Sequence, residues 1–360
     1  MSKTLIIAEA GVNHNGDAEL AFALVEAAAA SGADIVKFQT FQADLLVAPQ
    51  TPKAAYQQQL TDAAESQLDM LRRLQLSPAL HLELKKRAEA LGLEFMSTGF
   101  DHPSTEFLLK LNLQRYKIPS GELTNAPLLW HTARSGRPLI LSTGMATLGD
   151  IETALAVVAH AAVAIRPPSG MAEVWQYWNQ AAAVEKMRAQ VTLLHCTSQY
   201  PCPDQLVNLR AMNTLASTFG VAVGYSDHSL GTLVPATAVA LGATVIEKHF
   251  TLDRSLPGPD HQASLTPVEL KQMVEEIRRV EQILGHGIKQ PQAVERQTQQ
   301  VVRQRLVAQS AIAKGQLFDV NNLTTARSVS GLAAIHYWDL LGKPAGQDYF
   351  PMEPITETSL

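Results

Sequence analysis

The feature that most constrains this 360-residue sequence is the eightfold repetition of one unit, a short apolar run followed by a polar cluster and a helical stretch. The apolar runs have the residue types of strands, and the stretches between them have those of helices. The expected strands cover residues 5–8, 35–39, 93–98, 115–118, 139–144, 191–196, 221–224 and 243–249. Alternating units of this kind build either a closed barrel or an open doubly wound sheet. The count of eight, with polar residues just past every strand, favours an α/β fold of the (β/α)8 TIM-barrel class.

The repetition ends near residue 285, which predicts a barrel domain over residues 1–285. Residues 286–300 include a proline and a glutamine-rich stretch, which indicates a linker or an exposed helix. Residues 301–360 then contain short β-like pieces separated by turn signals. A module of this length has a marginal core of its own. We therefore expect it to pack on another surface, such as a second subunit.

Two insertions interrupt the repetition. Residues 40–76 follow the second strand, and loops after strands lie on the active face of such a barrel. This segment is therefore expected to be a lid or a substrate loop. Residues 164–190 precede the sixth strand, which places them on the opposite face or in the outer ring. We expect Trp175 and Trp178 there to pack locally or to form a contact surface.

Composition and charge exclude several classes of protein. The net charge of -5 argues against a nucleic-acid binder that relies on a basic surface. No apolar run is long enough for a membrane span, and the apolar run before Glu9 is too short for a secretory leader. Cys196 and Cys202 are too few for a disulfide framework and are expected to be buried thiols. These features predict a soluble, cytoplasmic protein.

Lys37 and Lys117 end strands that are otherwise apolar. A buried lysine is costly unless it meets a carboxylate or an anionic ligand. With the serines that follow nearby strands, the two lysines are suited to phosphate and carboxylate oxygens of a substrate. The alternative is a pair of internal ion pairs with Glu9 and Glu122.

His228 and His249 stand at the ends of the seventh and eighth strands. Because adjacent strands of a barrel end close together, both imidazoles can reach one divalent ion. Two histidine ligands would leave an open, Lewis-acidic site. The alternative is a pair of hydrogen-bonded histidines without a metal, and the spacing alone does not decide. Since no third histidine or cysteine completes a closed zinc site, the expected ion is an exchangeable Mn2+ or Mg2+.

Nine motifs in this order closely resemble the sialic acid synthase family. They read AEAGVNHNGD, VKFQTF, STGFD, YKIPSGELTN, LSTGMATL, LHCTSQYPCP, GYSDHSLG, EKHFTLD and GPDHQASL. The C-terminal module resembles that family's antifreeze-like, or SAF, domain. The resemblance implies a barrel enzyme that condenses phosphoenolpyruvate with an open-chain N-acetylated hexosamine to give a nonulosonic acid and phosphate. It also implies a divalent metal and a domain-swapped homodimer in which each SAF domain covers the partner's barrel.

Carried over motif by motif, the resemblance implies roles for individual residues. Glu9 and His228 are implied to be catalytic, and His228 and His249 to hold the metal. The residues implied to contact phosphoenolpyruvate are Lys37, Thr98, Lys117, Ser120, Ser142, Ser198 and Ser226. Those implied to contact the amino sugar are Gln39, Tyr200, Asp260 and Arg327, the last of which would reach across the dimer.

The main functional prediction is an N-acetylneuraminate synthase that uses N-acetylmannosamine. The alternative is an N,N'-diacetyllegionaminate synthase that uses a 2,4-diacetamido-6-deoxymannose. A non-catalytic sugar-binding or ice-binding protein is disfavoured by the joint presence of Lys37, Lys117, His228 and His249. A phosphoenolpyruvate-condensing barrel that makes a shorter acid is disfavoured by the SAF-like tail.

Overall fold

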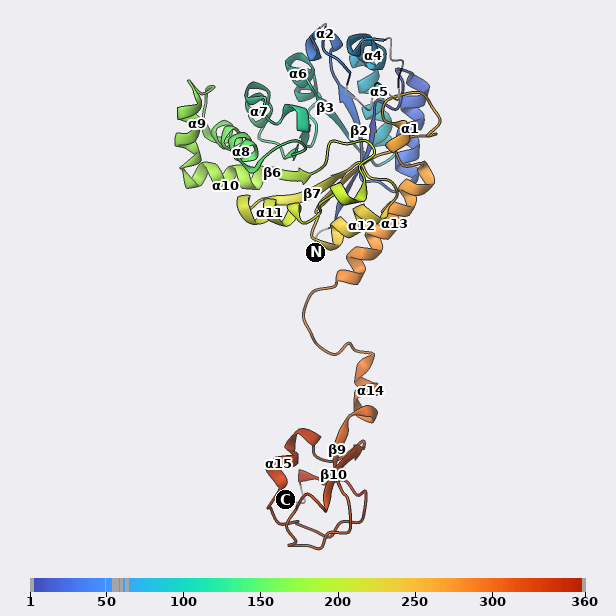
Figure 1. Ribbon diagram of the computed structural model, residues 1–360, viewed down its shortest axis with the longest axis vertical. Helices are drawn as coiled ribbons and strands as arrows, with labels where there is room; N and C mark the ends of the chain where they lie inside the picture. The colour runs from blue at the N-terminus through green and yellow to red at the C-terminus, as the bar shows by residue number, and fades with distance from the viewer. Residues whose placement is uncertain (1–2, 49, 54–57, 59–60, 62–64, 358–360) are drawn as a thin grey trace. The chain divides into compact units, whose positions relative to one another are not determined.

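A computed structural model describes residues 3–357 except 49, 54–57, 59–60 and 62–64 (Figure 1). The chain divides into two compact units, Met1–His286 and Gly287–Leu360. In the first unit eight parallel strands pair in chain order and close into a barrel, which confirms the (β/α)8 prediction. The strands are β1 (Leu5–Gly11), β2 (Ile35–Thr40), β3 (Glu94–Gly99), β4 (Tyr116–Ile118), β5 (Leu139–Ser142), β6 (Val191–His195), β7 (Ala222–Asp227) and β8 (Val245–His249).

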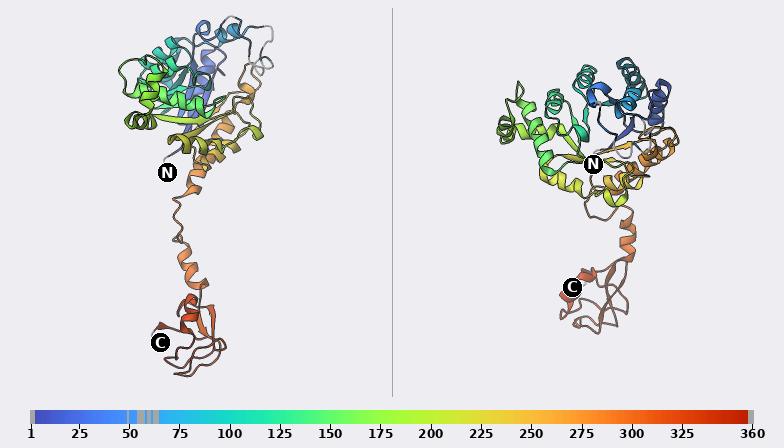
Figure 2. Two further views of the ribbon diagram at one scale, coloured as in Figure 1. Left: turned by 60° about the vertical axis from the view of Figure 1, so that its left-hand side comes forward. Right: turned by 45° about the horizontal axis from the view of Figure 1, so that its top comes forward.

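Helices surround the barrel, as Figure 2 shows from two further sides. They are α1 (Ala18–Ala30), α2 (Ala43–Leu46), α4 (Gln67–Leu74), α5 (Pro78–Ala90), α6 (His102–Lys110), α7 (Ala126–Ala133), α8 (Leu148–Val163), α9 (Met171–Trp178), α10 (Ala181–Gln190), α11 (Ala211–Phe219), α12 (Leu233–Ala240) and α13 (Pro267–Leu284). Side-chain caps explain where several of them begin. Asp17 caps α1, Asp101 caps α6, and capping boxes at Thr147 and Thr266 begin α8 and α13.

The barrel interior has an apolar layer beneath a polar one. The apolar layer is formed by Ile7, Ile35, Met96, Ile140, Leu194 and Val245. Because side chains alternate along a strand, the residue two positions further on points into the same interior. On five of these strands that residue is polar: Glu9, Lys37, Thr98, Ser142 and Glu247. The layering places buried polar side chains at the carboxyl ends of the strands, with the apolar layer below them.

Gly224 sets the close approach between β7 and β8. A Cβ atom at this position would lie 2.3 Å from the carbonyl oxygen of Val245 and 2.7 Å from a methyl carbon of Leu194. Only glycine therefore fits there without displacing the backbone. The close pairing sets Ser226 opposite Glu247 in the register of the two strands.

Both insertions have defined structure in the described residues. Helices α2 and α4 come from residues 40–76, and Met70 and Leu74 of α4 pack with Val12 and Phe41 in a separate apolar cluster. Helices α9 and α10 come from residues 164–190 and precede β6. Trp175 and Trp178 pack, partly buried, against the core beneath the helices, which confirms the prediction of local packing.

The second unit has its own small core. It contains α14 (Glu295–Val302), the antiparallel pair β9 (Gln304–Ala308) and β10 (Leu323–Arg327), and α15 (Tyr337–Leu340). Leu306, Phe318, Tyr349 and Ile355 are almost fully buried in it. Among the residues that the structure describes, no helix is both long and apolar enough to cross a membrane.

Two buried histidines anchor the loop between β1 and α1. The Nδ1 atom of His14 accepts a hydrogen bond from the backbone N–H of Gly16. His261 bonds through Nδ1 to the hydroxyl of Thr251 at 2.7 Å and through Nε2 to the side-chain oxygen of Asn15 at 3.2 Å. Burial lowers the pKa of both imidazoles from 6.5 to about 4. The folded protein therefore holds both rings neutral at mildly acidic pH.

This arrangement predicts a loss of stability in mild acid. Between pH 6.5 and 4 the unfolded chain binds protons at both histidines and the folded chain does not. The free energy of unfolding should fall as the pH falls through this window, by about 3 kcal/mol for each ring. Urea unfolding at pH 7 and pH 5 measures the slope. His14→Gln should reduce the slope and the exposed control His336→Gln should not; an unchanged slope in His14→Gln contradicts the prediction.

Candidate active site

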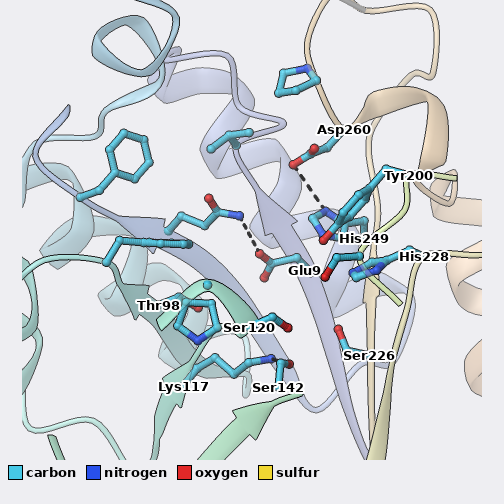
Figure 3. Close-up of a pocket in the computed structure, with 18 of the residues that line it drawn as sticks. Glu9, Thr98, Lys117, Ser120, Ser142, Tyr200, Ser226, His228, His249 and Asp260 are labelled. Carbon is cyan, nitrogen blue, oxygen red and sulfur yellow. Dashed lines mark hydrogen bonds and ion pairs between the residues drawn. The ribbon is translucent and has the colours of Figure 1, made fainter. Parts of the chain in front are cut away.

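A cavity of about 450 Å³ opens at the carboxyl ends of the strands (Figure 3). Every residue implicated by the sequence lines it, with the exception of Arg327. The lining residues from that set are Glu9, Lys37, Gln39, Thr98, Lys117, Ser120, Ser142, Ser198, Tyr200, Ser226, His228, His249 and Asp260. Arg327 belongs to the second unit, where it is exposed at the end of β10.

Both buried lysines are held by carboxylates. The Nζ atom of Lys37 lies 2.7 Å from Oε2 of Glu9 and 3.5 Å from Oε2 of Glu247. The Nζ atom of Lys117 donates to both oxygens of Glu247, at 2.7 and 2.8 Å. The alternative of internal ion pairs with Glu9 and Glu122 therefore holds for Glu9, which pairs with Lys37. It does not hold for Glu122, whose carboxylate accepts from the Asn125 amide while Lys117 pairs with Glu247. Glu247, which lies two residues before His249 on β8, is the partner that sequence reasoning missed.

The pKa values of the Glu9 and Glu247 carboxyl groups are shifted in opposite directions. Burial alone would raise the pKa of Glu247, but Lys117 and Lys37 hold it well below its usual range. Burial raises the pKa of Glu9, and Glu247 raises it further against the opposing effect of Lys37. The two lysines therefore favour the charged form of Glu247, whereas burial favours the protonated form of Glu9. Such a divergence between neighbouring carboxyls is typical of acid–base sites.

Hydroxyl groups and a backbone amide converge beside the lysines. Lys37 donates to the Thr98 hydroxyl at 3.1 Å, and Lys117 donates to the Ser142 hydroxyl at 2.7 Å. The N–H of Gly144 donates to the Ser120 hydroxyl at 3.0 Å. A Cβ atom at Gly144 would lie 2.3 Å from the Ser198 hydroxyl, so only glycine lets this backbone come so close. Ammonium groups and hydroxyls gathered in this way suit phosphate and carboxylate oxygens.

His228 and His249 lie together on the other side of Glu9, with ring centroids 5.7 Å apart (Figure 3). The Nδ1 atom of His228 is 2.7 Å from the Thr197 carbonyl oxygen. A carbonyl only accepts, so Nδ1 carries the proton and Nε2 keeps its lone pair. The Nδ1 atom of His249 is buried and has no hydrogen-bond partner among the described residues. Burial lowers the pKa of both rings, which favours neutral imidazoles, and two neutral imidazoles are suited to hold a divalent ion.

A buried lysine outside the barrel interior holds the loop that carries His228. The Nζ atom of Lys248 lies 2.5 Å from Oδ2 of Asp227 and 2.5 Å from the carbonyl oxygen of Ser229. Asp227 also accepts from the N–H and the hydroxyl of Ser229. These bonds tie the residues on both sides of His228 to β8. Sequence reasoning gave Lys248 no role, because the residue points away from the cavity.

The remaining residues form the outer part of the pocket. Gln39 donates to Oε1 of Glu9 at 3.2 Å, and the Tyr200 ring lies 4.0 Å from the His228 ring. Asp260 is buried 3.8 Å from Nδ1 of His249. Burial and the nearby Glu9 raise the pKa of Asp260 to about 7.

An apolar wall completes the pocket. We use this name for Val12, Phe41, Leu46, Met70, Leu71, Leu74 and Phe100, which form one cluster and line the cavity. Four of them are buried, and Phe41 and Phe100 meet edge to face at 6.2 Å. Most of the wall comes from residues 40–76, so this insertion lines the cavity on the face where the sequence placed it. Its role as a lid or a substrate loop stays a prediction. The members of the wall were not singled out from the sequence, since apolar residues in a loop give no signal of where they pack.

The two cysteines are free and buried, as expected. The Cys196 sulfur lies 3.2 Å from the Ser120 hydroxyl. Burial raises the pKa of the Cys196 thiol, so the group is a poor nucleophile.

Comparison with known proteins agrees with this architecture. The NeuB family model matches residues 24–289. The N,N'-diacetyllegionaminic acid synthase of Campylobacter jejuni is 46% identical over 99% of this chain and 100% of its own length. The N,N'-diacetyllegionaminic acid synthase of Legionella pneumophila is also 46% identical, over 94% of this chain and 89% of its own length.

Among solved structures, an N-acetylneuraminic acid synthetase from Leptospira borgpetersenii superposes with a TM-score of 0.67 at 33% identity. The match covers 82% of this chain and 90% of that one. The family model spans most of the barrel, and the relatives span nearly the whole chain. The chain therefore belongs to the NeuB family, the sialic acid synthase family that its sequence motifs resemble.

Proposed function

We propose that this phosphoenolpyruvate-dependent nonulosonic acid synthase is an N,N'-diacetyllegionaminate synthase. It would condense phosphoenolpyruvate, water and a 2,4-diacetamido-6-deoxymannose to give the nine-carbon acid and phosphate. The observation that carries this proposal is the 46% identity to two legionaminic acid synthases, compared with 33% to the N-acetylneuraminic acid synthetase. This proposal replaces the main prediction from the sequence, which was N-acetylneuraminate synthesis, with its alternative.

The apolar wall supports the same substrate. A 6-deoxy sugar carries a methyl group where N-acetylmannosamine carries a hydroxymethyl group, and its second acetamido group adds another methyl. Phe41, Met70 and Phe100 offer an apolar surface to such groups. A hydroxyl buried against the same surface would lose its hydrogen bonds to water without replacement. The wall therefore favours the deoxygenated sugar.

The polar groups account for the chemistry. Lys37 and Lys117, with the hydroxyls beside them, would hold the phosphate and carboxylate of phosphoenolpyruvate. C3 of phosphoenolpyruvate forms a bond to the aldehyde carbon of the sugar, and positive charge develops at C2. Water adds at C2, and the C–O bond to phosphate then breaks. Ammonium groups already in place stabilise the departing phosphate without reorganisation.

Glu9 lies between Lys117 and the two histidines in Figure 3, contacts Lys37 at 2.7 Å, and would transfer the protons. Glu9 would accept one proton from the attacking water and pass a proton to the new alkoxide on the sugar. The second proton of the water leaves with the phosphate when C2 becomes a carbonyl carbon. The raised pKa of Glu9 suits both directions of transfer. A divalent ion on His228 and His249 would supply Lewis-acid chemistry beside the aldehyde.

A cytoplasmic location and a swapped homodimer remain part of this proposal. Arg327 is the residue through which the SAF-like unit would contact the amino sugar of the partner's barrel. Its exposed position at the end of β10 leaves the guanidinium accessible for such a contact.

The substrate assignment is tested by assaying both sugars with purified protein, phosphoenolpyruvate and Mn2+. We expect kcat/KM for 2,4-diacetamido-6-deoxymannose to exceed that for N-acetylmannosamine by about tenfold or more, since an added hydroxyl in an apolar pocket lowers specificity by up to about 10²-fold. Phosphate release and the product mass are the measurements. A higher kcat/KM for N-acetylmannosamine than for the 6-deoxy sugar would contradict the proposal.

The role of Glu9 is tested by Glu9→Gln, which keeps the size of the side chain and its contact with Gln39. Because the change removes proton transfer, kcat should fall by roughly 10²–10⁴-fold while the KM for phosphoenolpyruvate changes little. Steady-state kinetics gives both constants. The matched control is Glu122→Gln, a carboxyl that bonds Asn125 and should leave both constants unchanged. Equal losses in kcat and in substrate affinity would contradict a proton-transfer role.

The role of the apolar wall is tested at Leu71, a half-buried residue that lines the cavity. Leu71→Asn keeps the side-chain size and places an amide in the wall. We expect kcat/KM for the 6-deoxy sugar to fall by about tenfold, with a smaller change for N-acetylmannosamine. Leu82→Asn, at an exposed leucine of α5, serves as the control. If both sugars lose activity in equal proportion, Leu71 does not set selectivity.

A further inference from the structure

We propose that a second metal site joins helix α6 to helix α7 and is formed by His102, Glu106 and His131. It binds a divalent transition-metal ion such as Zn2+ and is distinct from the pair His228 and His249. One ligand atom from each of the three side chains lies within 4.8 Å of the others. Among the described residues, no other group of three histidine, cysteine or carboxylate side chains meets this distance criterion.

The helices set this geometry. His102 and Glu106 are four residues apart on α6 and therefore lie on one face of it. His131 comes from α7, the next helix around the barrel (Figure 1). Its Nε2 atom lies 3.1 Å from Oε1 of Glu106, and its ring centroid lies 4.3 Å from that of His102. Side chains from two helices thus converge on one point.

The donor atoms are available to a cation. The Nε2 atom of His131 is buried and faces Oε1 of Glu106 at 3.1 Å, and no other polar partner reaches it among the described residues. Lys110 approaches Oε2 of Glu106 only to 4.0 Å, which leaves Oε1 directed at the histidine.

The donor set indicates the class of ion. Two imidazoles and one carboxylate are a recurrent Zn2+ ligand set, whereas Mg2+ and Ca2+ prefer oxygen ligands alone. Zinc bonds to these atoms are about 2.0–2.2 Å long, so the three atoms must move slightly closer to surround one ion. His102 is exposed and free to rotate by that amount. The same exposure leaves a fourth position open to water.

An ion bound between these three side chains would stabilise the N-terminal end of α6. Asp101 caps that helix through Ser104 and also accepts from the backbone N–H of Gln42, at the base of the 40–76 insertion. Phe100, one residue earlier, belongs to the apolar wall. An ion that binds only the folded protein stabilises it by mass action. Zn2+ should therefore raise the unfolding temperature through this site.

The test is metal stoichiometry in the full-length protein after dialysis against a chelator. Zn2+ titration by calorimetry, with Co2+ as an absorbing probe of coordination geometry, counts the ions per chain. His102→Gln, Glu106→Gln and His131→Gln should each bind one ion fewer than the unmodified chain. His336→Gln is the matched control, because His336 lies 3.0 Å from a carboxylate oxygen of Asp339 but belongs to no group of three such ligands among the residues that the structure describes. It should keep the full count.

His102→Gln is the decisive variant, because its exposed side chain can change without disturbing the core. Its kcat with saturating Mn2+ should match that of the unmodified enzyme, which shows that the lost ion is not the one at the active site. The Zn2+-dependent rise in unfolding temperature should shrink in the same variant. An unchanged stoichiometry in His102→Gln would overturn the proposal, and so would an equal loss in His336→Gln.

Discussion

The structure depends on a balance of charge inside the barrel. Two ammonium groups, on Lys37 and Lys117, share the interior with the carboxylates of Glu9 and Glu247. Each of these groups would be too costly to bury alone, and together they neutralise one another. The apolar layer beneath them keeps water out, which strengthens every interaction above it. An incoming anion therefore meets lysines that are already desolvated and held in position.

In the proposed function, the groups for the condensation and those for sugar selectivity come from different parts of the chain. The polar residues of the cavity, such as Glu9, Lys117 and His249, lie near the ends of the strands. Their positions follow from the pairing register between neighbouring strands of the barrel. The apolar wall comes mainly from the 40–76 insertion, which packs over the cavity as a cluster of its own. A change of sugar substrate can thus proceed through the insertion while the condensing groups stay in place.

Much of this site was predictable because the barrel has a strong repeat. Eight strands with polar residues after them fix which side chains share a face, and the lysines and histidines were found from that rule. Pairing inside the interior was not predictable in the same way. Lys117 has Glu122 five residues away in the sequence, yet it pairs with Glu247, since the curved sheet brings β8 across the interior. The pairing of Lys248 with Asp227 on the neighbouring strand was not predicted either, because it joins two strands on the side that faces away from the cavity.

The sequence by itself determined the fold class, the face on which the site lies and the residue types that bear the chemistry, because these follow from local periodicity and from the order of the motifs. Only the tertiary structure decided which carboxylate neutralises which lysine, that the insertion forms an apolar wall, and that His102, Glu106 and His131 converge. The physical reason is that such contacts join segments far apart along the chain. Their distances depend on strand curvature and helix packing, which no local pattern records.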